Sequence, residues 1–437
     1  MTHRMHRIDR KDFLKMGAVA TIASQASALA AQDAKPDTVK TVRIGLVGLG
    51  KRGSFLLRSL LTNHPGVSVP ALCDVNTERL AQGIQTVKRI QGNTPTGYSK
   101  DEYDYRNMFA RDDLDGILLA VDVQWFGKMA ADALKAGKHV GTEVTGPHTL
   151  DDCWSIVREK ERSGKRYMHL ENCCYGRDSM MVLNMIRQGV LGEPYYAECS
   201  YVHDIKGRFI DADGKLSWRG RLLVDGAGNS YPTHAVGSAA KWLSINDGDR
   251  FVSCVATQCD PREWQADAIA RFGQQSPAAK VVPKTGDFVA VLIRTAKGKM
   301  IRVDYSFTCT RPYSRYYLLQ GMNGCFDSRS GMYVKGTSPS YEFEPIAKYY
   351  EKFDHPFWRK DADIARKTGG HGGMDYFCIR DFVKMLREDR EPWIDCYDSA
   401  SWSSIYHCSS QSIAQNGAPV EMPDFTGGRW KDPNWRK

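Results

Sequence analysis

Short apolar runs alternate with amphipathic stretches along the first third of the chain. The run TVRIGLV is followed by the helical pattern SFLLRSLLTNH, and later apolar runs are SVPALCDV, GILLAVDV, HVGTEV and RYMHLEN. Helical patterns also separate the last of these runs, over WFGKMAADALKAGK and from Leu150 to Arg162. Strands that alternate with helices of this length are typical of a parallel, doubly wound sheet. The pattern therefore predicts an α/β domain over residues 41–175.

The pattern changes after a predicted helix near residues 177–190. From there the apolar runs are PYYAECSYV, FVSCVATQ, GDFVAVLIRT, KMIRVDYSFT and YYLLQG, separated by turns and long loops. These runs favour an open, mainly antiparallel sheet in an α+β domain over residues 176–437. A helix at about residues 374–388 is expected to pack back on the first domain. Two domains suit a chain of 437 residues.

A glycine-rich loop joins the first predicted strand to the first helix. Gly48, Gly50 and Gly53 form the pattern GxGxxG, in which the glycines allow a tight turn, approach of a pyrophosphate and close helix packing. The second strand ends in Asp74, 21 residues after Gly53, near the spacing of an acid that binds the ribose hydroxyls. The first domain is therefore predicted to be a Rossmann domain that prefers NAD to NADP.

The first residues of the chain have the character of an export signal. A basic segment precedes a weakly apolar run from Met16 to Ala30, which ends in the small-residue site Ala28-Leu29-Ala30. We expect a signal peptide over residues 1–31 and a linker over residues 32–40. The segment RKDFLK resembles the twin-arginine signal, which predicts export to the periplasm. The apolar run is too short for a stable membrane anchor.

Charge and cysteine usage narrow the classes of partner. The net charge is +9, but the basic residues are scattered and form no stripe, so nucleic acid is not an expected partner. The 12 cysteines include no CxxC pair, and no group of His, Asp or Glu has metal-ligand spacing. We therefore predict mostly free, buried thiols and no metal. The sequence leaves a homo-oligomer open.

Polar and aromatic residues concentrate in a few stretches: GTEVTGP, ENCCYGRD, WRG, YPTH and GHGGMDYF. Together with the glycine loop, these stretches resemble glycoside hydrolase family 109, the NAD-dependent α-N-acetylgalactosaminidases, within the glucose-fructose oxidoreductase superfamily. The resemblance runs from about residue 40 to DFTGGRWK near the C-terminus. It implies the same two-domain architecture, a carbohydrate or glycan terminus as substrate, and NAD that stays tightly bound and is recycled within each turnover.

The resemblance also implies roles for individual residues. Beyond the glycines and Asp74, it places the following residues at the cofactor: Lys51, Arg52, Val123, Gln124, Trp125, Phe126, Glu143, Val144, Asn172 and Tyr231. Relatives tend to have a histidine in place of Phe126. The residues implied to line the sugar pocket are Tyr175, Tyr201, Arg219, Tyr231, Pro232, Thr233, His234 and Tyr313.

In the family that the chain resembles, the reaction has no net redox change. Hydride passes from carbon 3 of the sugar to NAD, a base removes the proton on carbon 2, the glycosidic oxygen leaves, water adds and the hydride returns. NAD-dependent glycosidases are an exception to paired-carboxylate hydrolysis. His234 suits proton transfer at the carbon 3 hydroxyl. Tyr175 is the predicted base for carbon 2, with its pKa lowered by the nicotinamide ring and Arg219.

Two other functions remain open from the sequence. One is an NAD-dependent sugar dehydrogenase; such enzymes often carry Glu-Lys-Pro where this chain has Glu143-Val144-Thr145, and Val144 cannot replace the lysine. The other is a non-enzymatic sugar-binding protein that keeps NAD as a structural element.

Individual residues also have simpler, structural interpretations. His234 is open to a role as a helix cap, and the glycines around His371 favour a tight turn over catalysis.

Overall fold

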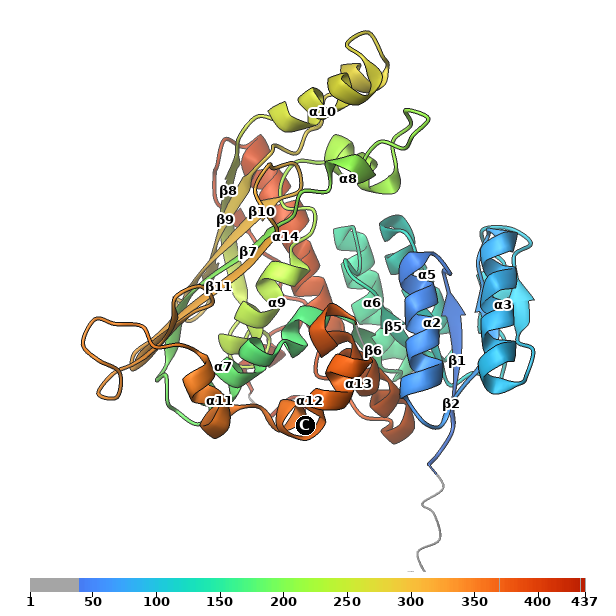
Figure 1. Cartoon of the computed structure of the whole chain (residues 1–437), viewed down its shortest axis with the longest axis horizontal. Coiled ribbons are helices and arrows are strands. Elements are labelled where there is room, and N and C mark those ends of the chain that lie inside the picture. Colours follow the sequence, from blue (N-terminus) through green and yellow to red (C-terminus); the bar gives the residue numbers. More distant parts are fainter. Residues whose placement is uncertain (1–38, 369, 433, 437) are drawn as a thin grey trace, which may run out of the picture. The chain divides into compact units, whose positions relative to one another are not determined.

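The computed structural model describes residues 39–368, 370–432 and 434–436 (Figure 1). The predicted signal peptide at residues 1–31 lies outside the described residues, as does most of the predicted linker at residues 32–40. The described residues from Val42 onward form one compact unit. None of the helices described combines the length and hydrophobicity that crossing a bilayer requires.

Six parallel strands form the first sheet, in the order β3-β2-β1-β4-β5-β6. The sheet extends in opposite directions from β1, and open α/β sheets bind ligands at the carboxyl ends of strands beside such a reversal. This topology confirms the predicted doubly wound sheet. The strands are β1 (Val42–Val47), β2 (Val67–Cys73), β3 (Thr96–Tyr98), β4 (Gly116–Leu119), β5 (His139–Thr142) and β6 (Tyr167–His169).

The connecting helices bury an apolar face and expose a polar one. In α2, for example, Leu56, Leu57 and Leu60 are buried. The predicted strand GILLAVDV is shorter than expected, because it ends at Leu119 and a helix begins at Val123. The helices are α2 (Lys51–Asn63), α3 (Thr77–Gln91), α4 (Tyr105–Phe109), α5 (Val123–Lys135) and α6 (Leu150–Ser163).

The second sheet has eight strands in the order β13-β12-β11-β7-β10-β9-β8-β14. Its neighbours pair antiparallel except for β7 and β10, which are parallel. The prediction of a mainly antiparallel sheet is confirmed. The strands are β7 (Pro194–Val202), β8 (Phe251–Gln258), β9 (Val289–Thr295), β10 (Met300–Ser306), β11 (Ser314–Gly321), β12 (Gly324–Asp327), β13 (Gly331–Val334) and β14 (Val420–Glu421).

Helices connect the two sheets. α9 packs on β7 and β11, α14 packs on β8 and α6, and α13 contacts α2 and β1 of the first sheet (Figure 1). These contacts hold the carboxyl edge of the first sheet near one face of the second. The α-helices of this part are α7 (Arg177–Arg187), α8 (Trp218–Asp225), α9 (Thr233–Trp242), α10 (Arg262–Phe272), α11 (Ala347–Phe353), α12 (Pro356–Lys367), α13 (Met374–Glu388) and α14 (Cys396–Ala414).

Short 3-10 turns complete the chain. Two of them border the site described below, η1 after β6 and η4 before α13. All 12 cysteines are free thiols, and all are buried except Cys259, Cys309 and Cys325. The turns are η1 (Asn172–Tyr175), η2 (Lys206–Arg208), η3 (Ala278–Lys280), η4 (His371–Gly373) and η5 (Arg429–Lys431).

Candidate functional site

The glycine loop has the close contacts that its pattern predicts. Gly48 has a φ of +88°, and a Cβ there would lie 2.3 Å from the Ala120 carbonyl oxygen. A Cβ on Gly53 would lie 1.8 Å from the Gly48 oxygen. By contrast, the space beside Gly50 is open, with Arg79 Nη1 nearest at 4.0 Å. The loop therefore leaves room for a pyrophosphate at the N-terminus of α2, and these residues fit a dinucleotide.

Asp74 lies beside this loop at the end of β2. Its carboxylate accepts hydrogen bonds from the backbone N–H of Leu49 at 2.6 Å and of Asn76 at 2.8 Å. These bonds fix the acid next to the glycine turn, where a Rossmann acid contacts the ribose.

Gly50→Ala is expected to weaken NAD binding without unfolding the chain. Gly50 has a φ of −62°, which alanine adopts freely, but the new methyl group enters the open space beside the loop. We expect the dissociation constant for NAD to rise about tenfold or more, which corresponds to roughly 1.4 kcal/mol, with an unchanged melting temperature. Titration with NAD measures the dissociation constant, and a thermal melt measures the melting temperature. Gly207→Ala, at another open glycine, is the control; unchanged NAD affinity in Gly50→Ala would contradict the assignment.

Arg52 anchors a buried charge network at the start of α2. Its Nε donates to Glu143 at 2.8 Å, and its two terminal nitrogens donate to Asp375 of α13 at 2.7 and 3.0 Å. Asp375 also accepts from Asn172 Nδ2 at 2.6 Å and lies 2.9 Å from His371 Nδ1. Although burial lowers it, Glu143 and Asp375 raise the pKa of Arg52 well above its usual value. Three predicted cofactor residues thus share one network.

The other predicted cofactor residues fall into two groups. Lys51 and Gln124 are exposed, and Trp125 and Val144 are half-buried, so each has surface to offer. Val123 and Phe126 belong to the hydrophobic core of the first sheet, and Phe126 is only 2% exposed. The predicted side-chain contact between Phe126 and the cofactor is therefore corrected to a core-packing role.

Four predicted sugar residues gather into an aromatic group beside the second sheet. Tyr201 at the end of β7 lies edge-on to His234, with ring centres 4.9 Å apart. Tyr231 lies 5.6 Å from Tyr201 and 5.1 Å from His234, and Tyr313 lies 6.0 Å from Tyr201. We call Tyr201, Tyr231, His234 and Tyr313 the aromatic group. Such rings offer stacking faces and hydroxyl donors to a sugar.

Three further predicted sugar residues, Arg219, Pro232 and Thr233, lie at the border of the aromatic group. Arg219 in α8 is half-buried, its guanidinium stacks on Trp218 at 4.0 Å, and burial lowers its pKa. Pro232 and Thr233 are buried where α9 begins. Their place explains how His234 is held, but it leaves their side chains little surface for a sugar.

His234 is part of a buried polar cluster that the sequence did not reveal. Its Nδ1 lies 2.7 Å from Glu171 Oε1 and 3.3 Å from Cys173 Sγ, and Arg315 Nη1 donates to that sulfur at 2.7 Å. Burial lowers the pKa of His234, but Cys173 and Glu171 outweigh it and raise the pKa to about 10. For Glu171 the two effects are reversed. Burial raises its pKa, but His234 outweighs burial and lowers the pKa to about 2. The pair is therefore held as a carboxylate and an imidazolium.

The same cluster is the group of potential metal ligands among the described residues. Atoms of Glu171, Cys173 and His234 lie within 4.8 Å of one another. Linear spacing could not show this, because His234 follows Cys173 by 61 residues. The hydrogen bond to Glu171 and the guanidinium of Arg315 already engage these atoms. The absence of a metal stays a prediction.

Tyr175 does not lie with the predicted sugar ligands. It is fully buried, its hydroxyl donates to Asp381 at 2.8 Å, and its ring packs edge-on against Trp393. Burial and Asp381 raise its pKa well above the usual value, the reverse of the lowering that a base at carbon 2 requires. The predicted lowering of this pKa is wrong, and we do not retain Tyr175 as the base.

Tyr175→Phe is accordingly expected to affect stability more than turnover. The change removes one donor from buried Asp381, which keeps Arg390 as a partner. A lost buried hydrogen bond costs about 1–3 kcal/mol. We expect kcat to stay within about threefold of that of the unmodified chain, which corresponds to a change in activation free energy below roughly 0.7 kcal/mol. The melting temperature should be lower. A kcat that vanishes while NAD stays bound would restore Tyr175 as a catalytic residue.

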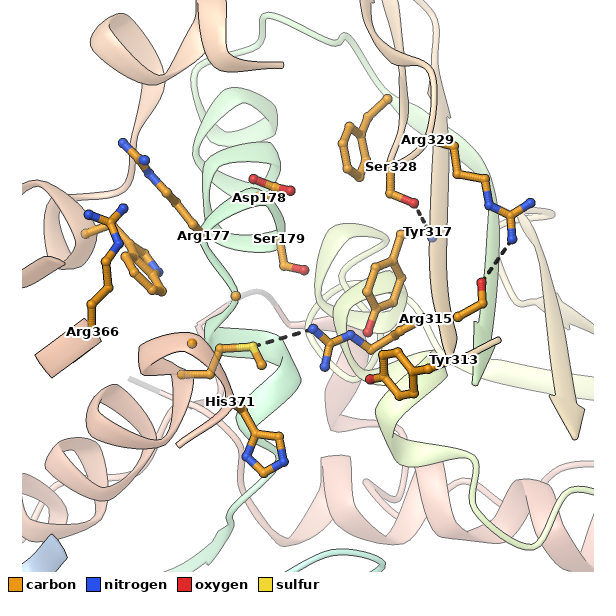
Figure 2. Close-up of a pocket in the computed structure, with 16 residues that line it drawn as sticks. Arg177, Asp178, Ser179, Tyr313, Arg315, Tyr317, Ser328, Arg329, Arg366 and His371 are labelled. Atoms are coloured by element: carbon orange, nitrogen blue, oxygen red, sulfur yellow. Dashed lines mark hydrogen bonds between the residues drawn. The ribbon is translucent and has the colours of Figure 1, made fainter. Parts of the chain in front are cut away.

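A cavity of about 560 Å³ adjoins the aromatic group, with which it shares Tyr313 (Figure 2). Arg315 and His371 also line it, and the His371 side chain is 53% exposed.

The sequence favoured a tight turn for His371, and the glycines beside it do adopt positive φ. The structure adds that this imidazole reaches the cavity as well as Asp375. In the sequence, the only sign of this position was that glycines flank His371.

Comparisons with protein families divide the chain in two. The family model described as "Oxidoreductase family, NAD-binding Rossmann fold" matches residues 42–170. The model described as "Glycosyl hydrolase 109, C-terminal domain" matches residues 175–432.

Whole-chain relatives and solved structures extend these matches. A "Glycosyl hydrolase family 109 protein" from Solibacter usitatus (strain Ellin6076) is 36% identical and covers 98% of this chain and 99% of its own. One from Shewanella sp. (strain W3-18-1) is 35% identical, with 98% of each chain covered. Among solved structures, an NAD binding oxidoreductase from Klebsiella pneumoniae has a TM-score of 0.67 at 16% identity and covers 88% of this chain and 99% of its own. A levoglucosan dehydrogenase in complex with NADH and levoglucosan has the same TM-score at 17% identity, with 88% and 100% covered. These structures share the fold.

Proposed function

Because the chain belongs to glycosyl hydrolase family 109, with an NAD-binding Rossmann domain, we propose that it hydrolyses terminal α-N-acetylgalactosaminides or related hexosides. The route is oxidation at carbon 3, elimination, addition of water and re-reduction. The observation that carries the proposal is the Glu171–His234 pair, because its imidazole belongs to the aromatic group. NAD, when bound, supplies an acceptor that takes up one hydride and returns it in the same turnover.

The residues of the chain handle the protons and the sugar. His234 exchanges the proton of the carbon 3 hydroxyl, and Glu171 orients its ring through Nδ1. Tyr201, Tyr231 and Tyr313 stack on the sugar and donate hydrogen bonds to it. We assign no residue to the carbon 2 proton.

The nucleotide end of the site is built from the other domain. Lys51 and the N-terminus of α2 would hold the pyrophosphate, while Arg52 and Asn172 are held in place by Asp375. This arrangement supports a cofactor that is retained between turnovers.

The test is release of p-nitrophenol from its α-N-acetylgalactosaminide by purified protein in heavy water without added NAD. Mass analysis of the free sugar follows. Release with one deuterium at carbon 2 is expected, because that proton exchanges with solvent during elimination. Release without deuterium overturns the route. No release, but NADH accumulation with free sugars and NAD, instead makes the chain a sugar dehydrogenase, the activity named for levoglucosan dehydrogenase of the same fold.

Glu171→Gln is expected to move the pH profile of kcat/KM to lower pH. Burial lowers the pKa of His234, whereas Cys173 and the Glu171 carboxylate together raise it to about 10, so loss of the Glu171 charge should bring that pKa down. Proton uptake by His234 needs the neutral ring, whose population grows as pH rises through the pKa. The rising limb should therefore move down by about one unit or more. Profiles between pH 5 and about 10 check this, and a limb at the same pH in Glu171→Gln would contradict the assignment.

A further inference from the structure

The cavity beside the aromatic group has a strongly basic wall. Its charged lining residues comprise four arginines, one histidine and a single acid, Asp178. Figure 2 shows Arg177 and Arg366 on one side of the cavity and Arg315 with Tyr313 on the other. These side chains come from α7, α12 and the start of β11, so only the tertiary fold brings them together.

Within the described residues, no carboxylate lies within ion-pair distance of three of the four guanidinium groups, those of Arg315, Arg329 and Arg366. Arg315 donates to sulfur, to Cys173 Sγ at 2.7 Å and to Met374 Sδ at 3.7 Å. Arg366 is exposed near the Trp358 ring, with no carboxylate within ion-pair distance. By contrast, Arg177 pairs with Asp354 at 2.6 Å. Arg329 donates to the neutral Ser314 hydroxyl at 3.0 Å. The positive charge along the cavity that no ion pair balances is thus that of Arg315, Arg329 and Arg366.

The backbone adds to this field. Residues 176–179, at the start of the 11-residue helix α7, line the same cavity, and the helix has no side-chain cap at its N-terminus. Free N–H groups at a helix start favour an anion. Charge from these arginines and the helix end therefore converges on one space next to the predicted sugar ligands.

We propose that this cavity is a subsite for an anionic substituent, a sulfate ester or a carboxylate, on the glycan that occupies the aromatic group. The proposal rests on the proposed function. Tyr313 belongs to both sites, so one glycan reaches from the aromatic group into the cavity. Arg315 and Arg366 pair with the substituent through charge-assisted hydrogen bonds. The chain is then selective for acidic glycans.

Matched substrates test the selectivity and locate the charge. One pair is p-nitrophenyl α-N-acetylgalactosaminide and its 6-sulfate, which places the anion on the cleaved sugar. The other pair consists of the glycoside of 2-carboxy-4-nitrophenol and the glycoside of the methyl ester of that phenol. In this pair the anion lies on the leaving group. We expect kcat/KM about tenfold higher for the anionic member of one pair, as for one charge-assisted hydrogen bond. Equal values within both pairs overturn the proposal.

Arg366→Gln is the diagnostic variant, and Lys367→Gln is its control. Both change one exposed cation at the end of α12, but Lys367 does not line the cavity. Arg366→Gln should lose most of the preference for the anionic substrate and keep its kcat/KM on the neutral one, while Lys367→Gln keeps both. Loss of preference in both variants, or in neither, overturns the subsite.

A binding measurement separates this proposal from the proposed function. Calorimetric titration with N-acetylgalactosamine 6-sulfate, N-acetylgalactosamine and sodium sulfate needs no turnover. Tighter binding of the sulfated sugar that Arg366→Gln abolishes supports the subsite, even if no glycoside is cleaved. Binding of inorganic sulfate alone, without preference between the two sugars, would show a general anion site and overturn the proposal.

Discussion

Replacing His234 by alanine is expected to lower kcat by about 10²- to 10⁴-fold, the usual contribution of a general acid or base. The imidazole is held by Glu171 at 2.7 Å and lies against the rings of Tyr201 and Tyr231, where the sugar is proposed to bind. NAD affinity should change little, because the glycine loop lies on the other domain. Steady-state kinetics with the aryl glycoside and a titration with NAD provide the two measurements.

The matched control for this variant is His407→Ala. His407 is half-buried in α14 and its Nε2 lies 2.6 Å from the His148 carbonyl oxygen, outside the aromatic group. Its loss should leave kcat unchanged within about twofold, or roughly 0.4 kcal/mol. If His234→Ala retains the kcat of the control, then His234 is a structural histidine at the start of α9 and its assignment to carbon 3 fails.

Replacing Asp375 by alanine is expected to lower the free energy of unfolding by about 3–5 kcal/mol, as for a broken buried ion pair. Asp375 is 1% exposed and accepts hydrogen bonds from Arg52 and Asn172. Without it, the half-buried Arg52 keeps only Glu143 as a carboxylate partner. Denaturant unfolding measures the loss. Asp363→Ala, at an exposed position of α12, is the control and should cost less than about 0.5 kcal/mol.

The cost of losing the Asp375 charge should depend on pH. Burial raises the pKa of Asp375, but hydrogen bonds from His371 and Arg52 outweigh it and hold the pKa well below its usual value. A depressed pKa stabilises the folded state above the unfolded value of about 4, and this contribution is lost as pH falls through the folded value. The difference in stability between the unmodified chain and Asp375→Asn should therefore be full near neutrality and shrink below about pH 4. A constant difference across this range would contradict the ionised state.

The sequence determined those features that depend on neighbours along the chain. Alternation of apolar runs with amphipathic helices predicted the parallel sheet, and the β-rich runs predicted the second sheet, because both periodicities are local. The glycine loop and Asp74 were found for the same reason, since their geometry depends on residues a few positions apart. The helix α14 was missed. Its serines and apolar residues are buried on nearly all sides, so it has no polar face to mark its period.

The tertiary structure decided which chemical groups meet. Cys173 and Glu171 precede His234 by 61 and 63 residues, and their contacts with its ring outweigh burial and raise its pKa. Tyr175 lies in one of the stretches that suggested catalysis, yet the fold turns its hydroxyl to Asp381 and buries it. A protonation state depends on the charges and solvent within a few ångströms, and only the folded chain determines these. The sequence thus determined the architecture and the nucleotide loop, whereas packing decided which polar side chains can exchange a proton.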